Sequence, residues 1–170
     1  MTMAIWGSSR HHTLLRFGHR DWEGMVRELG RRGGGHREAG AFLMARRGGD
    51  RRHVVRAVYL DDLDPHCLQG NHIHFHGRAY SKLWDICDSD RLVVVGDVHT
   101  HGGDWVEQSP IDGDHRILCV DGHVALILPH LATRHLLPRN VGVHRYGGSA
   151  GWESWSGDDA RRRLHIRRLR

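Results

Sequence analysis

Two histidines that follow an apolar run are the residues whose types and spacing point to metal chemistry. His99 and His101 come after Leu92–Val95, a run that predicts a buried strand. Side chains two positions apart on a strand point to the same face of the sheet. Both imidazoles can therefore meet a single ion, and the pair predicts a metal site at the end of this strand.

A carboxylate follows the two histidines at a spacing that suits a third ligand. Gly102 and Gly103 break the strand, and Ser109 with Pro110 is typical of a helix cap and first helical position. Asp112 then falls in the first helical turn, from which it can turn back toward the histidines. Two histidines and a carboxylate, with the fourth position open, are the ligand set of a catalytic zinc site. The same Ser-x-x-Asp spacing also suits a capping box without any metal.

The order and spacing of these residues resemble the JAMM zinc metalloprotease family, whose fold is called MPN, Mov34 or JAB-like. The family motif sets His-x-His before Ser-x-x-Asp, as in His99, His101, Ser109 and Asp112. It also needs an upstream glutamate followed by glycine and large apolar residues, and the run from Glu38 to Met44 fits.

The resemblance implies a role for each motif residue. It implies one zinc ion per chain, held by His99, His101 and Asp112. Glu38 would be the general base, in contact with the activated water and not with the metal. Ser109 would donate a hydrogen bond to the oxyanion of the intermediate. The chain departs from the family at Gly102, where proline is common.

The family cleaves bonds at the C-terminus of ubiquitin or ubiquitin-like modifiers. The resemblance thus implies a zinc-dependent isopeptidase or peptidase that deconjugates or processes such a modifier. Smaller bacterial members are similar in size to this chain, and some are encoded beside activating and conjugating enzymes, including antiviral systems. The expected partners are the modifier or its conjugate, together with those enzymes. The alternatives are a non-catalytic MPN scaffold and a nucleic-acid-associated metalloenzyme.

The apolar periodicity predicts the α+β class, with a curved mixed sheet flanked by two main helices. The main helices are expected at 21–32 and 77–88, and a short helix is expected after Ser109. Strands are expected at 11–18, 38–46, 52–60, 72–76, from 92 to the metal motif, near 117–120, and at 123–128 and 141–146. One MPN (JAB-like) domain would span residues 1–157, followed by a basic tail over 158–170.

A second group of histidines lies outside this motif. His72, His74 and His76 would share one face of the strand expected at 72–76, where they suit either a second metal site or a partly exposed polar face. No carboxylate lies close to them in the sequence. This group is therefore a weaker candidate for catalysis than the motif at 99–112.

The distribution of charge bears on whether the protein binds nucleic acid. The net charge is +5, but the tail from Asp158 carries six arginines and two aspartates, so the rest of the chain is nearly neutral. A globally basic nucleic-acid binder is not indicated, and the tail suits either an acidic partner or a solvated, frayed terminus.

The cysteines favour a reducing compartment. Cys67, Cys87 and Cys119 are odd in number and scattered, which argues against a disulfide framework. Met1 to His12 has no apolar core of signal-peptide length, and no run approaches the length of a membrane span. A cytoplasmic protein without a membrane partner is expected.

Overall fold

The computed structural model describes residues 13–69, 72–109 and 120–167. The strands are β1 (Leu15–Gly18), β2 (Gly40–Arg46), β3 (Arg56–Tyr59), β4 (Leu92–Thr100), β5 (Val124–Leu128), β6 (Gly142–Tyr146), β7 (Trp152–Trp155) and β8 (Leu164–Arg167). The α-helices are α1 (His19–Gly33), α2 (Leu60–Leu63), α3 (Tyr80–Ser89) and α5 (Gly157–Arg163). Short 3₁₀ helices are η1 (Gly77–Ala79), η2 (His130–Ala132), η3 (Pro138–Asn140) and η4 (Gly148–Ala150).

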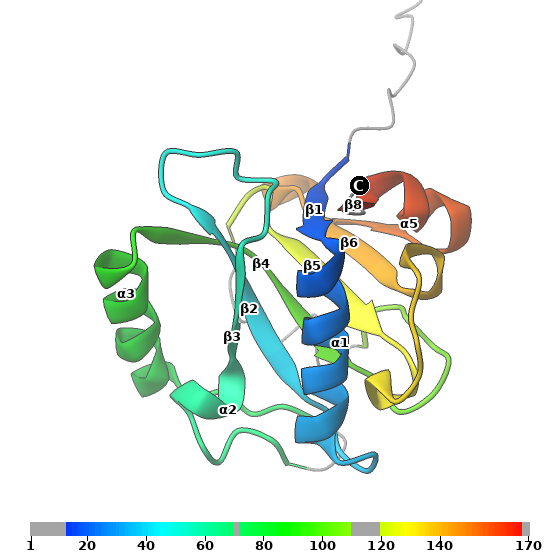
Figure 1. Ribbon diagram of the computed structural model, residues 1–170, viewed down its shortest axis with the longest axis horizontal. Coiled ribbons are helices and arrows are strands. Elements are labelled where there is room, and N and C mark those ends of the chain that lie inside the picture. The colour runs from blue at the N-terminus through cyan, green and yellow to red at the C-terminus, as the bar shows by residue number, and fades with distance from the viewer. Residues whose placement is uncertain (1–12, 70–71, 110–119, 168–170) are drawn as a thin grey trace, which may run out of the picture.

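Six strands form one mixed sheet in the order β3-β2-β4-β5-β6-β7. Neighbouring strands in it are antiparallel except β4 and β5, which run parallel. β4 crosses the middle of the sheet between β2 and β5 (Figure 1). β1 and β8 form a separate parallel pair. The described residues therefore have the α+β class that the sequence predicts.

Helix α1 forms because one of its faces is continuously apolar. Trp22, Met25, Val26 and Leu29 recur at helical spacing and are all buried. They pack with buried residues of β2, β4 and β5 in one core cluster. The helix ends at Gly34, whose left-handed backbone (φ 59°) suits glycine at this position. The helix predicted at 21–32 is confirmed.

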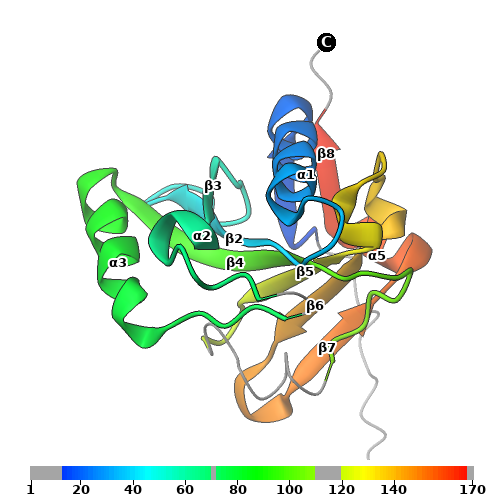
Figure 2. The same cartoon turned by 90° about the horizontal axis from the view of Figure 1, so that it is seen from below.

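The other face of β2 carries a second core cluster. Phe42 and Met44 are fully buried there, beside Leu83 and Cys87 of α3. Residues 41, 43 and 45 of β2 are buried as well, so this strand has core on both faces. Figure 2 shows α1 and α3 on the two sides of the sheet. The helix predicted at 77–88 corresponds to η1 and α3.

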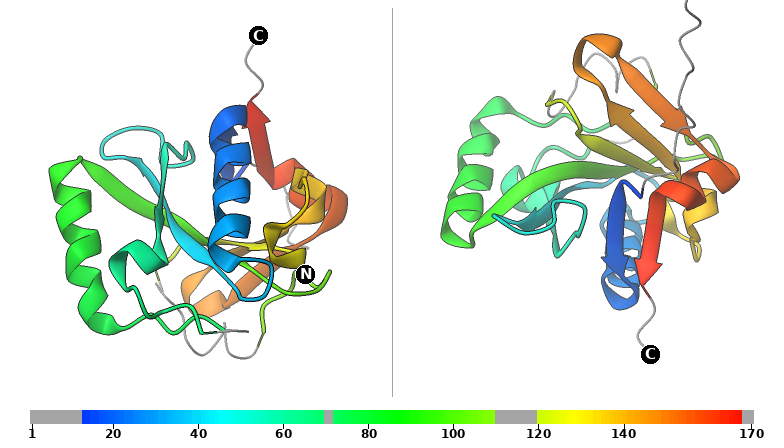
Figure 3. Two further views of the ribbon diagram at one scale, coloured as in Figure 1. Left: turned by 60° about the horizontal axis from the view of Figure 1, so that its bottom comes forward. Right: turned by 90° about the horizontal axis from the view of Figure 1, so that it is seen from above.

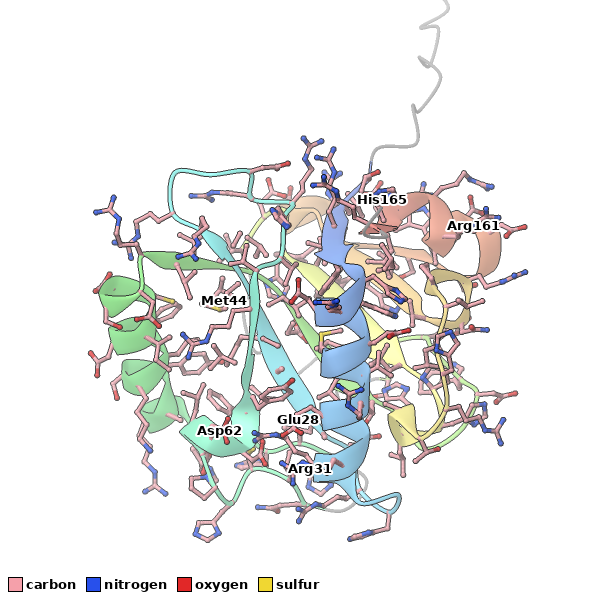
Figure 4. All side chains as sticks on the ribbon, viewed as in Figure 1. Glu28, Arg31, Met44, Asp62, Arg161 and His165 are labelled. Carbon is pink, nitrogen blue, oxygen red and sulfur yellow. The ribbon has the colours of Figure 1, made fainter. Side chains whose placement is uncertain are left out.

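An ionic cluster joins α1 to α2. Arg32 is 13 % exposed and donates hydrogen bonds to Glu28, Asp61 and Asp62 at 2.6–2.8 Å. Figure 4 shows Glu28 and Asp62 facing each other from the two helices. Hydrogen bonds from Arg31 and Arg32 lower the pKa of Glu28 to about 2 even though burial opposes this shift. The cluster fixes the start of the segment that follows β3.

Two expectations about the first half of the chain are wrong. Residues 72–76 do not form a strand, because their one ladder contact is an isolated bridge between Leu68 and Ile73. The segment instead runs irregularly into η1. The second strand of the first hairpin is also shorter than predicted, since β3 begins only at Arg56 and the following loop starts with α2.

The C-terminal segment is more ordered than predicted. β7, α5 and β8 were not expected, yet Ala160 and Leu164 belong to the core cluster under α1. β8 pairs in parallel with β1, so the two ends of the described chain lie side by side (Figure 1). A solvated, frayed terminus is therefore wrong for residues 158–167.

Several predicted features lie outside the described residues. These are Asp112, Cys119, the short helix after Ser109 and most of the strand near 117–120. Among the helices that are described, none is long and apolar enough to cross a membrane.

Candidate metal centre

The C-terminal half of β4 brings the two motif histidines together on one face. His99 is paired with Gly40 of β2 and Ile127 of β5, so its backbone is fixed from both sides. His99 and His101 are 7 % and 6 % exposed. Their Nε2 atoms lie 3.1 Å apart and face each other. The two imidazoles therefore form a pair of converging nitrogens, as the sequence predicts.

The outer nitrogens of the two rings face oxygen acceptors. The Nδ1–H of His101 donates to the Trp105 carbonyl oxygen at 3.1 Å, and the Trp105 ring stacks on the imidazole at 5.2 Å. His99 Nδ1 lies 3.8 Å from Asp97 Oδ2. A carbonyl oxygen can only accept, so neutral His101 carries its proton on Nδ1 and a lone pair on Nε2. Two nitrogens at this separation need a proton or a cation between them.

The donor geometry fits a divalent metal ion such as zinc. Zinc–imidazole bonds of about 2.0–2.1 Å place two nitrogens of a tetrahedral site about 3.3 Å apart, close to the 3.1 Å found here. Outer ring nitrogens that donate to a carbonyl or carboxylate are the usual support of such ligands. Within residues 13–69, 72–109 and 120–167 no group of three potential ligands occurs. The predicted third ligand, Asp112, falls outside these ranges.

A buried carboxylate, that of Asp97, lies close to His99 of the histidine pair. Asp97 lies on the same face of β4 and is 7 % exposed. Its Oδ1 accepts a hydrogen bond of 2.5 Å from His123 Nε2 at the start of β5. Burial alone would raise the pKa of Asp97, but the hydrogen bond from His123 and the nearby imidazole of His99 lower it to about 2. Asp97 is thus an anion between two imidazoles.

A fourth histidine anchors the loop after the motif. His144 is 1 % exposed on β6, and its Nε2–H donates to the Val106 carbonyl oxygen at 2.9 Å. Its Nδ1 accepts from the Ser154 hydroxyl of β7 at 2.8 Å. Burial lowers the pKa of His144, so the ring is held neutral. A Cβ on Gly142 would lie 2.0 Å from the same carbonyl, so only glycine permits this approach.

Neither His123 nor His144 was predicted from the sequence as a site residue. Each of them alternates with buried residues in a predicted strand. Strand alternation could therefore have indicated that both side chains face the interior. Their partners, however, come from strands far apart in the sequence.

A left-handed turn also holds the motif loop. His130, Leu131 and Ala132 all have positive φ, between 52° and 55°. Within this turn the His130 amide donates to the Gly103 carbonyl oxygen at 2.7 Å, and the Leu131 amide donates to that of His101 at 2.8 Å. Backbone hydrogen bonds therefore restrain the loop that carries Gly102, where the resembled family often has proline.

Glu38 lies beside the histidine pair by strand register. Gly40 is opposite His99, and Thr100 is bonded to Ala39 through both its amide and its hydroxyl, each at 3.0 Å. Glu38 directly precedes Ala39, so it lies just beyond the end of this pairing, next to the end of β4 that leads into His101. Glu38 is half-buried. A Cβ on Gly40 would lie 2.8 Å from a Leu60 methyl group, so a glycine is needed between the glutamate and the core.

Ser109 is half-buried at the end of the segment that leaves His101. This segment is fixed by the Trp105 and Val106 carbonyl groups, which accept hydrogen bonds from His101 and His144.

The other histidine group does not share one face of a strand as expected. His74 and His76 contact each other edge to face at 4.6 Å. His76 Nδ1 bonds to Asp64, which is 4 % exposed and also accepts from the backbone amides of His66 and His76. Asp64 lies 12 residues before His76 and is therefore not close to it in the sequence, but it contacts His76 in the fold. Asp64 instead ties residues 64–76 into a closed loop.

Comparisons with known proteins add the fold. No family description matches the chain. The solution structure of protein DSY2949 from Desulfitobacterium hafniense is 17 % identical, with a TM-score of 0.65, and the match covers 91 % of this chain and 94 % of that one. AF2198, a JAB1/MPN domain protein from Archaeoglobus fulgidus, is 11 % identical, with a TM-score of 0.41 and coverage of 91 % and 97 %. The first likeness shows a shared fold, and the second is too remote to carry an argument.

Proposed function

We propose that this protein is a zinc-dependent isopeptidase or peptidase that cleaves at the C-terminus of a ubiquitin-like modifier. The observation that carries the proposal is the pair of His99 and His101 Nε2 atoms, 3.1 Å apart, with both outer nitrogens facing oxygen. The motif resemblance, which adds Glu38, Ser109 and Asp112, supports the reaction class. The function belongs to a bacterial modifier-conjugation pathway with its activating and conjugating enzymes as partners.

His99, His101 and Asp112 would hold the ion. When bound, zinc supplies Lewis acidity that polarises a carbonyl group and lowers the pKa of water to about 7. The Asp97 carboxylate and the Trp105 carbonyl orient the two imidazoles from behind. The chain therefore provides the ligands and also the groups that orient the two imidazole ligands.

The remaining chemistry belongs to Glu38 and Ser109. Glu38, which lies just beyond the end of the β2–β4 pairing, would take a proton from the attacking water and return it to the leaving amine. The Ser109 hydroxyl donates a hydrogen bond to the oxygen on which negative charge develops. Each role needs a half-buried side chain that can face both the ligand pair and the substrate.

The surface around the histidine pair suits a narrow substrate. Gly102 and Gly103 are both exposed, and a Cβ on Gly102 would meet no atom of the described residues within 4 Å. The open space beside the motif accepts an extended modifier tail with small residues near the cleaved bond. Cys67 and Cys87 are free and buried, and burial raises the pKa of Cys67 to about 12. Free cysteines in the described part of the chain agree with action in the cytoplasm.

Replacing Glu38 tests the proposal against a non-catalytic scaffold. Glu38→Gln should reduce cleavage of a modifier fusion by about 10²–10⁴-fold, the usual contribution of a general base, while zinc content and modifier binding stay at the parent level. Glu23→Gln on α1 is the matched control and should cleave normally. Cleavage by Glu38→Gln at the parent rate would reject the assignment of the base. Modifier binding without any cleavage by the parent protein would favour the scaffold.

A further inference from the structure

The first residues of β4 have a neighbouring strand on one side only. β4 pairs with β2 from Leu92 to His99, but its pairing with β5 begins at Gly96. Among the described residues, no strand lies against the other edge of Leu92–Val95. Figure 3 (right) shows this part of β4 running toward α3 without β5 beside it. A central strand of the sheet thus carries a short free edge.

A large apolar cavity follows this edge. Its volume is about 850 Å³, and Val93–Val95 line it together with Leu14 near β1, Trp84 of α3 and Val120. Trp84 is 44 % exposed and Val120 is 62 % exposed. Val95 packs toward the core cluster under α1 and Val94 toward the cluster under α3. The cavity is therefore in contact with side chains from both faces of β4. This is the position that a further strand paired with Leu92–Val95 would occupy.

The rim of the cavity is positively charged. Its charged lining consists of the arginines Arg47, Arg51, Arg52 and Arg145, the aspartates Asp88 and Asp121, and His123. Arg47 is paired with Asp88 at 2.6 Å. Arg51 is exposed and makes no ion pair with any residue in the described part of the chain. Arg52 is paired with Asp50, and Arg145 lies 3.8 Å from Glu153. Among the described residues, Arg51 is therefore the arginine of this lining that is left to pair with an acidic side chain of an occupant.

We propose that this cavity is a docking groove for an extended peptide of a partner protein, in which apolar residues alternate with acidic ones. Backbone N–H and C=O groups alternate between the two sides of a strand, so those of Leu92–Val95 that face away from β2 point into the groove. A peptide strand added there gains main-chain hydrogen bonds. Its apolar side chains contact Leu14 or Trp84, and its carboxylates reach the arginines.

The groove does not include the proposed metal ligands, although His123, which lines it, bonds to Asp97 behind His99. It follows the N-terminal half of β4, whereas the histidine pair lies at the C-terminal half. The free strand edge favours a peptide over a small amphiphilic anion, because an amphiphile would leave these backbone groups without partners. A free edge inside a sheet is also a feature that proteins normally cover.

Fluorescence anisotropy with the full chain tests the proposal. The probe is a fluorescein-labelled peptide of alternating Val and Glu, compared with Val/Lys and Val/Ser peptides and with a Val/Glu peptide carrying N-methylated backbone nitrogens. The Val/Glu peptide should bind, and Arg51→Glu should weaken it about tenfold or more through like-charge repulsion. Arg161→Glu on α5 is the control for net charge and should leave binding unchanged.

Each outcome decides for or against the groove. Selective binding of Val/Glu, lost with N-methylation and with Arg51→Glu, supports strand addition at β4. Equal binding of the N-methylated peptide, or complete displacement by dodecanoate, would overturn it in favour of an amphiphile site. Absence of binding by every peptide in the panel overturns the proposal as well. Cleavage of modifier fusions should be unchanged in Arg51→Glu, so failure here does not affect the proposed hydrolase.

Discussion

Two stretches of this chain alternate histidine with other residues, and they fold differently. His99 and His101 lie on a strand that is hydrogen-bonded on both sides, so their rings converge with Nε2 atoms 3.1 Å apart. His74 and His76 lie on an irregular loop, where the rings pack edge to face. Alternation places side chains on one face only where neighbouring strands hold the backbone extended. The difference lies in the pairing of the backbone.

The carboxylates beside the two groups differ in the same way. Asp97 shares its oxygens between the imidazoles of His123 and His99. Asp64 bonds to one imidazole and to two backbone amides, which closes a loop. Asp97 is therefore suited to orient ligands, whereas Asp64 is suited to hold structure.

Asp97→Asn is expected to give the larger effect on function. The asparagine amide carries no negative charge and has only one oxygen acceptor, so it cannot replace the carboxylate next to both imidazoles. Zinc affinity and hydrolysis should therefore fall about 10–100-fold, as is usual for groups behind a metal ligand. The measurement is zinc affinity by competition with a chelator, alongside cleavage of a modifier fusion. The matched change Asp64→Asn should leave zinc affinity within about twofold. Equal losses in both variants would contradict the distinction between the two carboxylates.

Asp64→Asn is expected to act on stability instead. It removes hydrogen bonds to a buried charged group, which should lower the free energy of unfolding by about 1–3 kcal/mol in urea titrations at neutral pH. Burial opposes ionisation of Asp64, but the bonds from His76 and His66 lower its pKa below the usual value. Its contribution is therefore fully present above the unfolded pKa of about 3.9 and is lost as the pH falls through the lower folded value.

The difference in stability between parent and Asp64→Asn should accordingly be constant near neutral pH and shrink in acid. A difference that instead grows as the pH falls from about 5 would contradict a carboxylate with a lowered pKa.

Local patterns in the sequence were sufficient for the elements around the metal motif. The helical spacing of Trp22 to Leu29 and the apolar run before His99 predict α1 and β4 directly. Strand alternation then predicts that His99 and His101 share a face. These inferences hold because each depends on residues close together in the chain.

Long-range pairing accounts for what the sequence did not reveal. β8 is a strand of four residues that is stabilised by β1, nearly the whole chain away, through Leu164 opposite Leu15. His123 and His144 enter the site because β5 and β6 pair beside β4. The irregular path of residues 72–76 likewise depends on Asp64. None of these contacts has a local sequence signal.

Metal content tests the central claim most directly, because it compares the two histidine groups in one measurement. Purified parent protein, the His99→Ala/His101→Ala double variant and the His74→Ala/His76→Ala double variant are analysed for zinc after dialysis. The account predicts about one zinc per chain in the parent and in His74→Ala/His76→Ala, and none in His99→Ala/His101→Ala. Zinc retained without His99 and His101, or lost without His74 and His76, would contradict it.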